Sequence, residues 1–103
     1  MMIKAEEILE KIEKGKPVEY ENVIIYGDLD LHRLDLPLNK RRQKIIKSSI
    51  KIEYSVIKGD VFFDHACFSG LVDFDGTSFT KAANFSGSLG KPFVIAQVES
   101  TRR

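Results

Sequence analysis

The residues best suited to chemistry lie close together at Asp64, His65 and Cys67. A histidine beside a cysteine can take the thiol proton, so a small hydrolase-like or thiol enzyme using the His65 and Cys67 neighbourhood is one hypothesis. Two features of the sequence count against it. Both residues occupy slots predicted to face outward on different sides of a corner, and no carboxylate is placed to orient the histidine. We therefore expect no catalytic residue and predict that the protein is not an enzyme.

The sequence lacks the residue patterns expected of a metal site, an acid–base pair or a nucleotide-binding loop. A zinc site built on Cys67 and the two histidines lacks ligands and spacing, because His32 is predicted to lie more than one coil away. Glycines recur as turns and never as a phosphate-binding loop ahead of a helix. Four aspartates cluster in the sequence, and we interpret them as solvated corner residues rather than an acid–base pair: Asp60, Asp64, Asp73 and Asp75. The sequence thus predicts neither a metal nor a cofactor.

The strongest concentration of charge lies in residues 37–45, PLNKRRQKI, where Lys40, Arg41, Arg42 and Lys44 cluster. The simpler interpretation is a solvated loop, and the functional alternative is a contact for phosphate or for an acidic partner. No aromatic residue is interleaved with these cations, and the net charge of the whole chain is only +1. Both observations argue against dedicated nucleic-acid binding.

A short repeat between residues 50 and 89 must position all of these side chains. Large apolar residues recur there at alternating spacings of five and six, and a small or apolar residue stands two positions before each of them. Glycine recurs two positions after the large residue, at Gly59, Gly70, Gly76 and Gly87. An amphipathic helix needs spacings of three and four, and a strand needs strict alternation. A short period with a turn in each unit instead predicts a solenoid.

Two units of this repeat, Ala66-Cys67-Phe68-Ser69-Gly70 and Ala83-Asn84-Phe85-Ser86-Gly87, resemble those of pentapeptide-repeat proteins. The resemblance covers roughly residues 18–90. It implies an all-β fold, a right-handed four-sided β-helix of about three to four coils, here with an N-terminal capping α-helix. Family members mostly lack a known activity, and a subset resembles DNA in shape and charge. That role needs a strongly acidic surface, so 16 Lys and Arg against 15 Asp and Glu make this chain unsuited to it.

Four sides per coil predict that units four apart stack, with strands about 4.8 Å apart. The predicted columns are Ile25–Ile46–Phe68, Leu31–Ile52–Phe74, Leu36–Ile57–Phe79 and Phe63–Phe85. Ala66 and Ala83 are expected to be buried as well. The predicted core centres are therefore Ile25, Leu31, Leu36, Ile46, Ile52, Ile57, Phe63, Phe68, Phe74, Phe79 and Phe85.

Both ends of the predicted solenoid need covering. Residues 3–14 form an amphipathic pattern that predicts a helix capping the first coil, ended by Gly15 and Pro17. The acidic residues on its polar face disfavour a membrane-surface helix. The tail is apolar at Phe93, Val94 and Ile95, and it either lies over the last coil or leaves an open patch. An uncovered strand edge attracts another chain, so we predict a homodimer through the C-terminal end, with a self-capped monomer as the alternative.

Length and composition are ordinary for a single folded domain. The 103 residues predict one domain, with a capping helix in residues 1–16, the solenoid in 18–90 and the tail in 91–103. No apolar run approaches the roughly 20 residues of a membrane span, and no secretory signal is recognisable. A single cysteine predicts a reducing, cytoplasmic environment. We expect a structural or protein-interaction module with an unknown protein partner.

Overall fold

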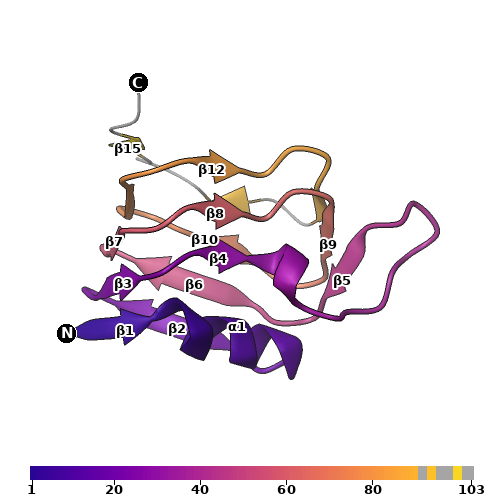
Figure 1. Cartoon of the computed structure of the whole chain (residues 1–103), viewed down its shortest axis with the longest axis horizontal. Coiled ribbons are helices and arrows are strands. Elements are labelled where there is room, and N and C mark those ends of the chain that lie inside the picture. Colours follow the sequence, from indigo (N-terminus) through magenta and orange to yellow (C-terminus); the bar gives the residue numbers. More distant parts are fainter. Residues whose placement is uncertain (91–92, 95–98, 101–103) are drawn as a thin grey trace.

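The structure is a computed structural model that describes residues 1–90, 93–94 and 99–100 of the 103-residue chain. It is mostly β, with one α-helix near the N-terminus and short strands stacked in parallel (Figure 1). Within the described residues, no helix is long and apolar enough to cross a membrane.

The strands form four parallel sheets, and the chain passes through them repeatedly in the same order. The first pass comprises β2 (Val18–Glu21), β3 (Ile24–Tyr26), β4 (Leu29–Asp30) and β5 (Lys44–Ile46). The second comprises β6 (Ile50–Glu53), β7 (Val56–Ile57), β8 (Val61–Phe62) and β9 (Ala66–Phe68). The third comprises β10 (Val72–Asp73), β11 (Ser78–Phe79), β12 (Ala83–Asn84) and β13 (Leu89–Gly90).

Each sheet collects the strands that occupy the same place in successive passes. Sheet A contains β1, β3, β7, β11 and β15, and sheet B contains β2, β6, β10 and β14. Sheet C contains β4, β8 and β12, and sheet D contains β5, β9 and β13. The strands outside the three passes are β1 (Met2–Lys4), β14 (Phe93–Val94) and β15 (Glu99–Ser100). Stacked parallel strands of this kind are compatible with a β-helix.

From β5 onward, successive passes are in the predicted register. Ile46 pairs with Phe68 and Ile57 pairs with Phe79, so that each residue stacks on the one 22 positions later. The same offset joins β8 to β12, where Val61 pairs with Ala83. The spacing of the large residues therefore predicted these pairings correctly.

The predicted pairings of the first pass are wrong. Ile25 pairs with Ile57, an offset of 32 residues, because the chain leaves the sheets between β4 and β5. A short 3-10 helix, η1 (Leu31–Arg33), opens this excursion, and residues 34–43 continue it. A fixed period counted across an insertion is displaced by the length of that insertion. The incorrect pairings are Ile25–Ile46, Leu31–Ile52 and Leu36–Ile57.

Large apolar side chains fill the interior between the four sheets. All of the predicted centres are buried except Leu36 and Phe85, which are only partly buried. The phenylalanine rings of different passes touch, with centroids 5.6 Å apart for Phe63 and Phe85 and 6.1 Å apart for Phe63 and Phe74. Leu36 is displaced because it belongs to the excursion between η1 and β5.

The prediction that Ala83 is buried is wrong. Ala83 is exposed in β12, which forms the outer edge of sheet C among the described residues. A side chain in the last strand of a stack lacks the neighbour that would cover it from the next pass. Phe85, which follows β12, is partly exposed for the same reason.

Two glycine corners let a ring pack directly on the backbone of the next pass. Tyr54 and Gly76 follow β6 and β10 at the same corner, both with positive φ, and a Cβ on Gly76 would lie 2.4 Å from the Tyr54 ring. His65 and Gly87 repeat the arrangement after β8 and β12, where the corresponding distance is 3.0 Å. Glycine is needed at the second position of each pair because it adopts positive φ without cost and leaves room for the ring.

The N-terminal helix is shorter than predicted. Residues 2–4 form β1, which pairs with β3 and buries Ile3 opposite Ile25, and α1 (Ala5–Glu13) begins only after this strand. An edge strand presents unpaired backbone groups, so pairing with β3 outweighs one more helical turn. The apolar face of α1 is buried, and the helix contacts β1, β2 and β4.

Gly15 ends the helix, as the sequence predicts. Its φ is +72°, and its backbone N–H donates to the carbonyl of Ile12. The next N–H, of Lys16, donates to the carbonyl of Lys11 at 2.8 Å. These two bonds are those of a Schellman motif, which turns the chain sharply into β2.

We expect Phe74→Ala to lower the free energy of unfolding by about 3–5 kcal/mol, because it removes a fully buried ring and leaves a cavity. Urea denaturation followed by circular dichroism measures the loss. Phe85→Ala is the matched control and should cost less, since that ring is partly exposed. A loss below about 1 kcal/mol for Phe74→Ala would contradict interior packing of the ring.

Candidate functional site

His65 and Cys67 do not form an assembled pair. His65 occupies the corner after β8, and its side chain is 70% exposed. Cys67 alternates with the buried Ala66 and Phe68 in β9, so its side chain lies on the outer face of sheet D. No hydrogen bond joins His65 to Cys67 among the described residues.

Asp64 lies between two histidines, an arrangement that the sequence analysis missed. The Nε2 atom of His32 is 3.0 Å from Asp64 Oδ1, and the Nδ1 atom of His65 is 3.1 Å from Asp64 Oδ2. Two expectations are therefore wrong. A carboxylate, that of Asp64, does orient His65, and His32 lies directly beside Asp64 rather than more than one coil away. The pairing of β4 with β8 places residue 32 next to residue 64, at the offset of 32 that the excursion creates. The sequence predicted an offset of 21 residues for the first pass, and only the true offset of 32 brings His32 to Asp64.

The environment of the Asp64 carboxyl favours its charged form. Burial by itself raises the pKa of Asp64, but hydrogen bonds from His65, from its own backbone amide and from His32 outweigh burial. Together they hold this pKa below its ordinary value of 3.8. Both histidine rings remain largely exposed, at 57% for His32 and 70% for His65.

This His–Asp–His cluster is suited to holding adjacent passes together. It joins η1 of the first pass to the corner after β8 of the second. A nucleophile would need to lie within hydrogen-bond reach of a histidine, and Cys67 does not. Among the described residues, no group of three or more His, Cys, Asp or Glu side chains could hold a metal ion.

Residues 37–45, which we call the basic hairpin, fold into an ordered loop that projects from the sheets between η1 and β5 (Figure 1). Leu38 and Lys44 form an antiparallel bridge, and the Ile45 N–H donates to the Pro37 carbonyl at 2.8 Å. Ile45 also lies in β5, so the hairpin returns directly into sheet D.

Asn39 organises the turn of the basic hairpin. Its Oδ1 accepts hydrogen bonds from the backbone N–H groups of Arg41 at 2.8 Å and Gln43 at 3.0 Å. Its Nδ2 donates to Gln43 Oε1 at 2.8 Å, and its carbonyl accepts from the Arg42 N–H. Asparagine side chains commonly stabilise turns in this way. The cations are conspicuous in the sequence, but Asn39, a single neutral residue, arranges the turn that carries them.

The base of the basic hairpin is anchored while its tip is free. Gln43 is 6% exposed, and its Nε2 donates to the Gly87 carbonyl at 2.7 Å. Lys40, Arg41 and Arg42 at the tip are exposed, and none of their side chains forms an ion pair with a described residue. The predicted cation cluster is thus held in place by neutral side chains.

Acidic side chains gather elsewhere, on the outer face of sheet B. Glu19 and Asp73 both pair with Lys51, and Glu21 pairs with Glu53. Loss of solvation raises the pKa of Glu53, and a hydrogen bond to Asp73 raises it further. Lys51, 4.0 Å from Glu53, supplies the opposing charge. A net charge of +1 therefore hides two surfaces of opposite sign.

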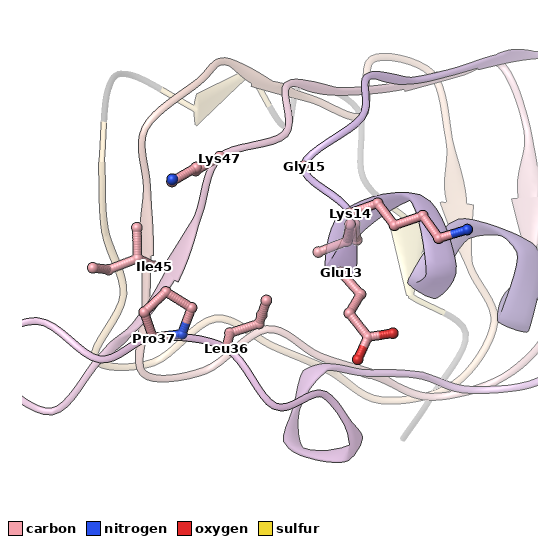
Figure 2. A pocket seen from close by; sticks show the side chains of 8 residues that line it. Glu13, Lys14, Gly15, Leu36, Pro37, Ile45 and Lys47 are labelled. Carbon is pink, nitrogen blue, oxygen red and sulfur yellow. The ribbon is translucent and has the colours of Figure 1, made fainter.

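A pocket of about 170 Å³ lies between the end of α1 and the base of the basic hairpin (Figure 2). The helix contributes the turn that ends at Gly15, and the hairpin side contributes Leu36, Pro37 and Ile45. Lys47 follows β5 and lines the same pocket. The pocket thus lies at the base of the hairpin whose tip carries the exposed cations Lys40, Arg41 and Arg42.

The described part of the tail continues two of the sheets. Val72 of β10 pairs with Phe93 of β14 and Asp73 with Val94, and β15 pairs with β11. Two stretches of the tail therefore lie over the final pass, which is one of the two predicted possibilities. Ile95, the third predicted contact residue of the tail, lies outside the described residues.

Comparison with protein-family models, with curated proteins and with solved structures finds no match to this chain. The pentapeptide-repeat family thus remains a resemblance carried by the repeat units. A function must be argued from the arrangement of the residues themselves.

We expect Asp64→Asn to destabilise the protein at pH values above the ordinary carboxyl pKa. The destabilisation should become smaller as the pH is lowered. Because the folded pKa lies below 3.8, the carboxylate adds stability above that value and loses it as the pH falls through the folded pKa. Urea denaturation between about pH 5 and pH 2 measures the difference from the wild type. Asp35→Asn, at an exposed position, is the control. A difference that stays constant across this range would contradict the assignment.

Proposed function

We propose that this protein is a non-enzymatic protein-interaction module, a cytoplasmic member of the pentapeptide-repeat family. The finer form of the fold is a right-handed four-sided β-helix of three to four coils, with α1 capping its first coil. The repeated order of the four sheets and the Ala-x-Phe units at Ala66 and Ala83 support this assignment. Such a fold supplies a rigid frame from which a loop can be displayed.

The observation that carries the proposal is the basic hairpin, whose backbone is held by side-chain hydrogen bonds and whose tip cations form no ion pair with a described residue. Ordering a loop costs conformational entropy, and bringing three cations together costs electrostatic energy. Asn39 and Gln43 supply hydrogen bonds that offset these costs. A loop ordered before binding loses less entropy when a partner docks, which strengthens association. We infer that the hairpin contacts an acidic protein surface through Lys40, Arg41 and Arg42.

The alternative, a hydrolase-like or thiol enzyme, has weaker support. His65 and Cys67 have different neighbours. His65 interacts with Asp64, whereas Cys67 lies in sheet D between its pairing partners Ile45 and Leu89. The same capture experiment that tests the interaction module also discriminates between these two functions.

We expect the double variant Lys40→Glu/Arg41→Glu to lose the protein partner that wild type captures from an extract of its native host. The reversed charges would repel an acidic surface, and both side chains are exposed, so the fold should be retained. Quantitative mass spectrometry of the captured proteins measures the loss. The control His65→Gln/Cys67→Ser should keep the partner. If the control loses it while its melting temperature is unchanged, a site at His65 and Cys67 is supported instead.

We also propose that two copies associate through the C-terminal end. At that end Ala83 is exposed, Phe85 is only partly buried, and β12 and β13 are edge strands among the described residues. The sequence that follows is apolar at Phe93, Val94 and Ile95. Twofold stacking would cover both ends at once, which favours a closed dimer.

We expect light scattering at micromolar concentration to give twice the monomer mass of 11.7 kDa. Ile95→Lys should shift the mass to that of the monomer without a change in the circular dichroism spectrum, because it places a charge in an apolar sequence. The conservative control Ile95→Val should remain dimeric. A wild-type mass near 11.7 kDa would rule out the dimer.

A further inference from the structure

The pocket beside the basic hairpin has the size of a site for one side chain. Its volume of about 170 Å³ is well below the roughly 300–1,000 Å³ of sites that enclose a small-molecule ligand. Figure 2 shows Leu36, Pro37 and Ile45 along one wall and the last turn of α1 along the other. Ile45 occupies an outward position of β5, because its neighbour Ile46 points into the core. An outward aliphatic residue at this position makes the wall apolar.

The lining of this pocket carries charges of both signs at its edge. The last turn of a helix carries a partial negative charge on its carbonyl groups, and Glu13 adds a full charge at the same place. Lys14 and Lys47 line the same pocket with positive charge, and Lys14 also pairs with Glu10. The apolar wall of Leu36, Pro37 and Ile45 therefore decides what enters, and it favours an uncharged aliphatic group.

The segment that forms the basic hairpin is cationic. No acidic residue occurs between Asp35 and Glu53, and the exposed cations Lys40, Arg41 and Arg42 lie at the hairpin tip. No aromatic residue occurs in that segment either, so the bases of a nucleic acid would find no stacking surface on it. Charge complementarity therefore favours carboxylates that lie outside the pocket, over the hairpin tip.

We propose that the pocket and the basic hairpin together bind an acidic segment of a partner protein. One aliphatic side chain of that segment enters the pocket between Gly15 and Ile45, and flanking carboxylates contact Lys40, Arg41 and Arg42. This inference rests on the proposed interaction function and specifies the chemistry of the partner. The pocket supplies selectivity for the aliphatic residue, and the hairpin supplies the electrostatic attraction.

Fluorescence anisotropy with two labelled peptides tests this directly on the wild-type protein. Both peptides carry glutamates on either side of a central residue, which is leucine in one and alanine in the other. The leucine peptide should bind about tenfold to a hundredfold more tightly, as expected for burial of one aliphatic side chain. Affinity for both peptides should fall as salt is added. Equal affinities for the two peptides would overturn the proposal.

Variants separate the two parts of the site. Ile45→Ser should abolish the preference for leucine over alanine and leave the salt-dependent binding, with a thermal melt as the check on folding. Arg41→Glu should weaken both peptides equally, and Lys58→Glu, at an exposed position in another part of the fold, should weaken neither. If a single-stranded oligonucleotide of matched charge binds as tightly as the leucine peptide, the assignment to an acidic protein segment is wrong.

The same variants distinguish failure of this inference from failure of the proposed function. Suppose that the peptides do not bind although capture from the host extract still depends on Lys40 and Arg41. The acidic, aliphatic partner is then wrong and the interaction module stands. If capture is independent of both residues, the hairpin is not the contact surface and both proposals fail.

Discussion

Hydrogen bonding between successive passes of the chain is the constraint on which the rest of this structure depends. Most of the strands contain only two or three residues and have no stability of their own. Each is held by the strands of the neighbouring passes, so every pass must present its backbone groups in register with the next. The Phe63, Phe74 and Phe79 rings then pack against one another in the interior, in tilted and edge-on contacts. An insertion is tolerated only if it leaves the sheets and returns at the same place.

The basic hairpin leaves the sheets and returns to them at the same place, so its residues need not pack in the core. It leaves after η1, returns in β5, and fixes its own shape through Asn39 and Gln43 rather than through burial of large apolar groups. Its exposed cations are thereby brought together without disturbing the stacked sheets. The charges are divided in the same way. The exposed cations lie on the inserted hairpin, and the acidic side chains lie on the outer face of sheet B, among the stacked strands.

The register also explains contacts that are far apart in the sequence. Because β4 pairs with β8, His32 meets Asp64 across 32 residues, and the carboxylate links two passes at one corner. At the N-terminus, pairing of β1 with β3 covers a backbone edge that would otherwise be open. Both contacts stabilise the edges and corners of the stack, where short strands alone give little cohesion.

The sequence by itself determined the local and periodic features: the spacing of the large residues, the buried face of α1, its end at Gly15, and the 22-residue offset after β5. These follow from side-chain size and backbone preference within a few residues, so they can be read from the chain in order. Only the tertiary structure decided the 32-residue first pass, the strand at Met2–Lys4 and the meeting of His32 with Asp64. It also decided that Asn39 shapes the basic hairpin. Each of these depends on which backbone lies beside which, and that register is set by long-range pairing around an insertion whose length the local pattern does not encode.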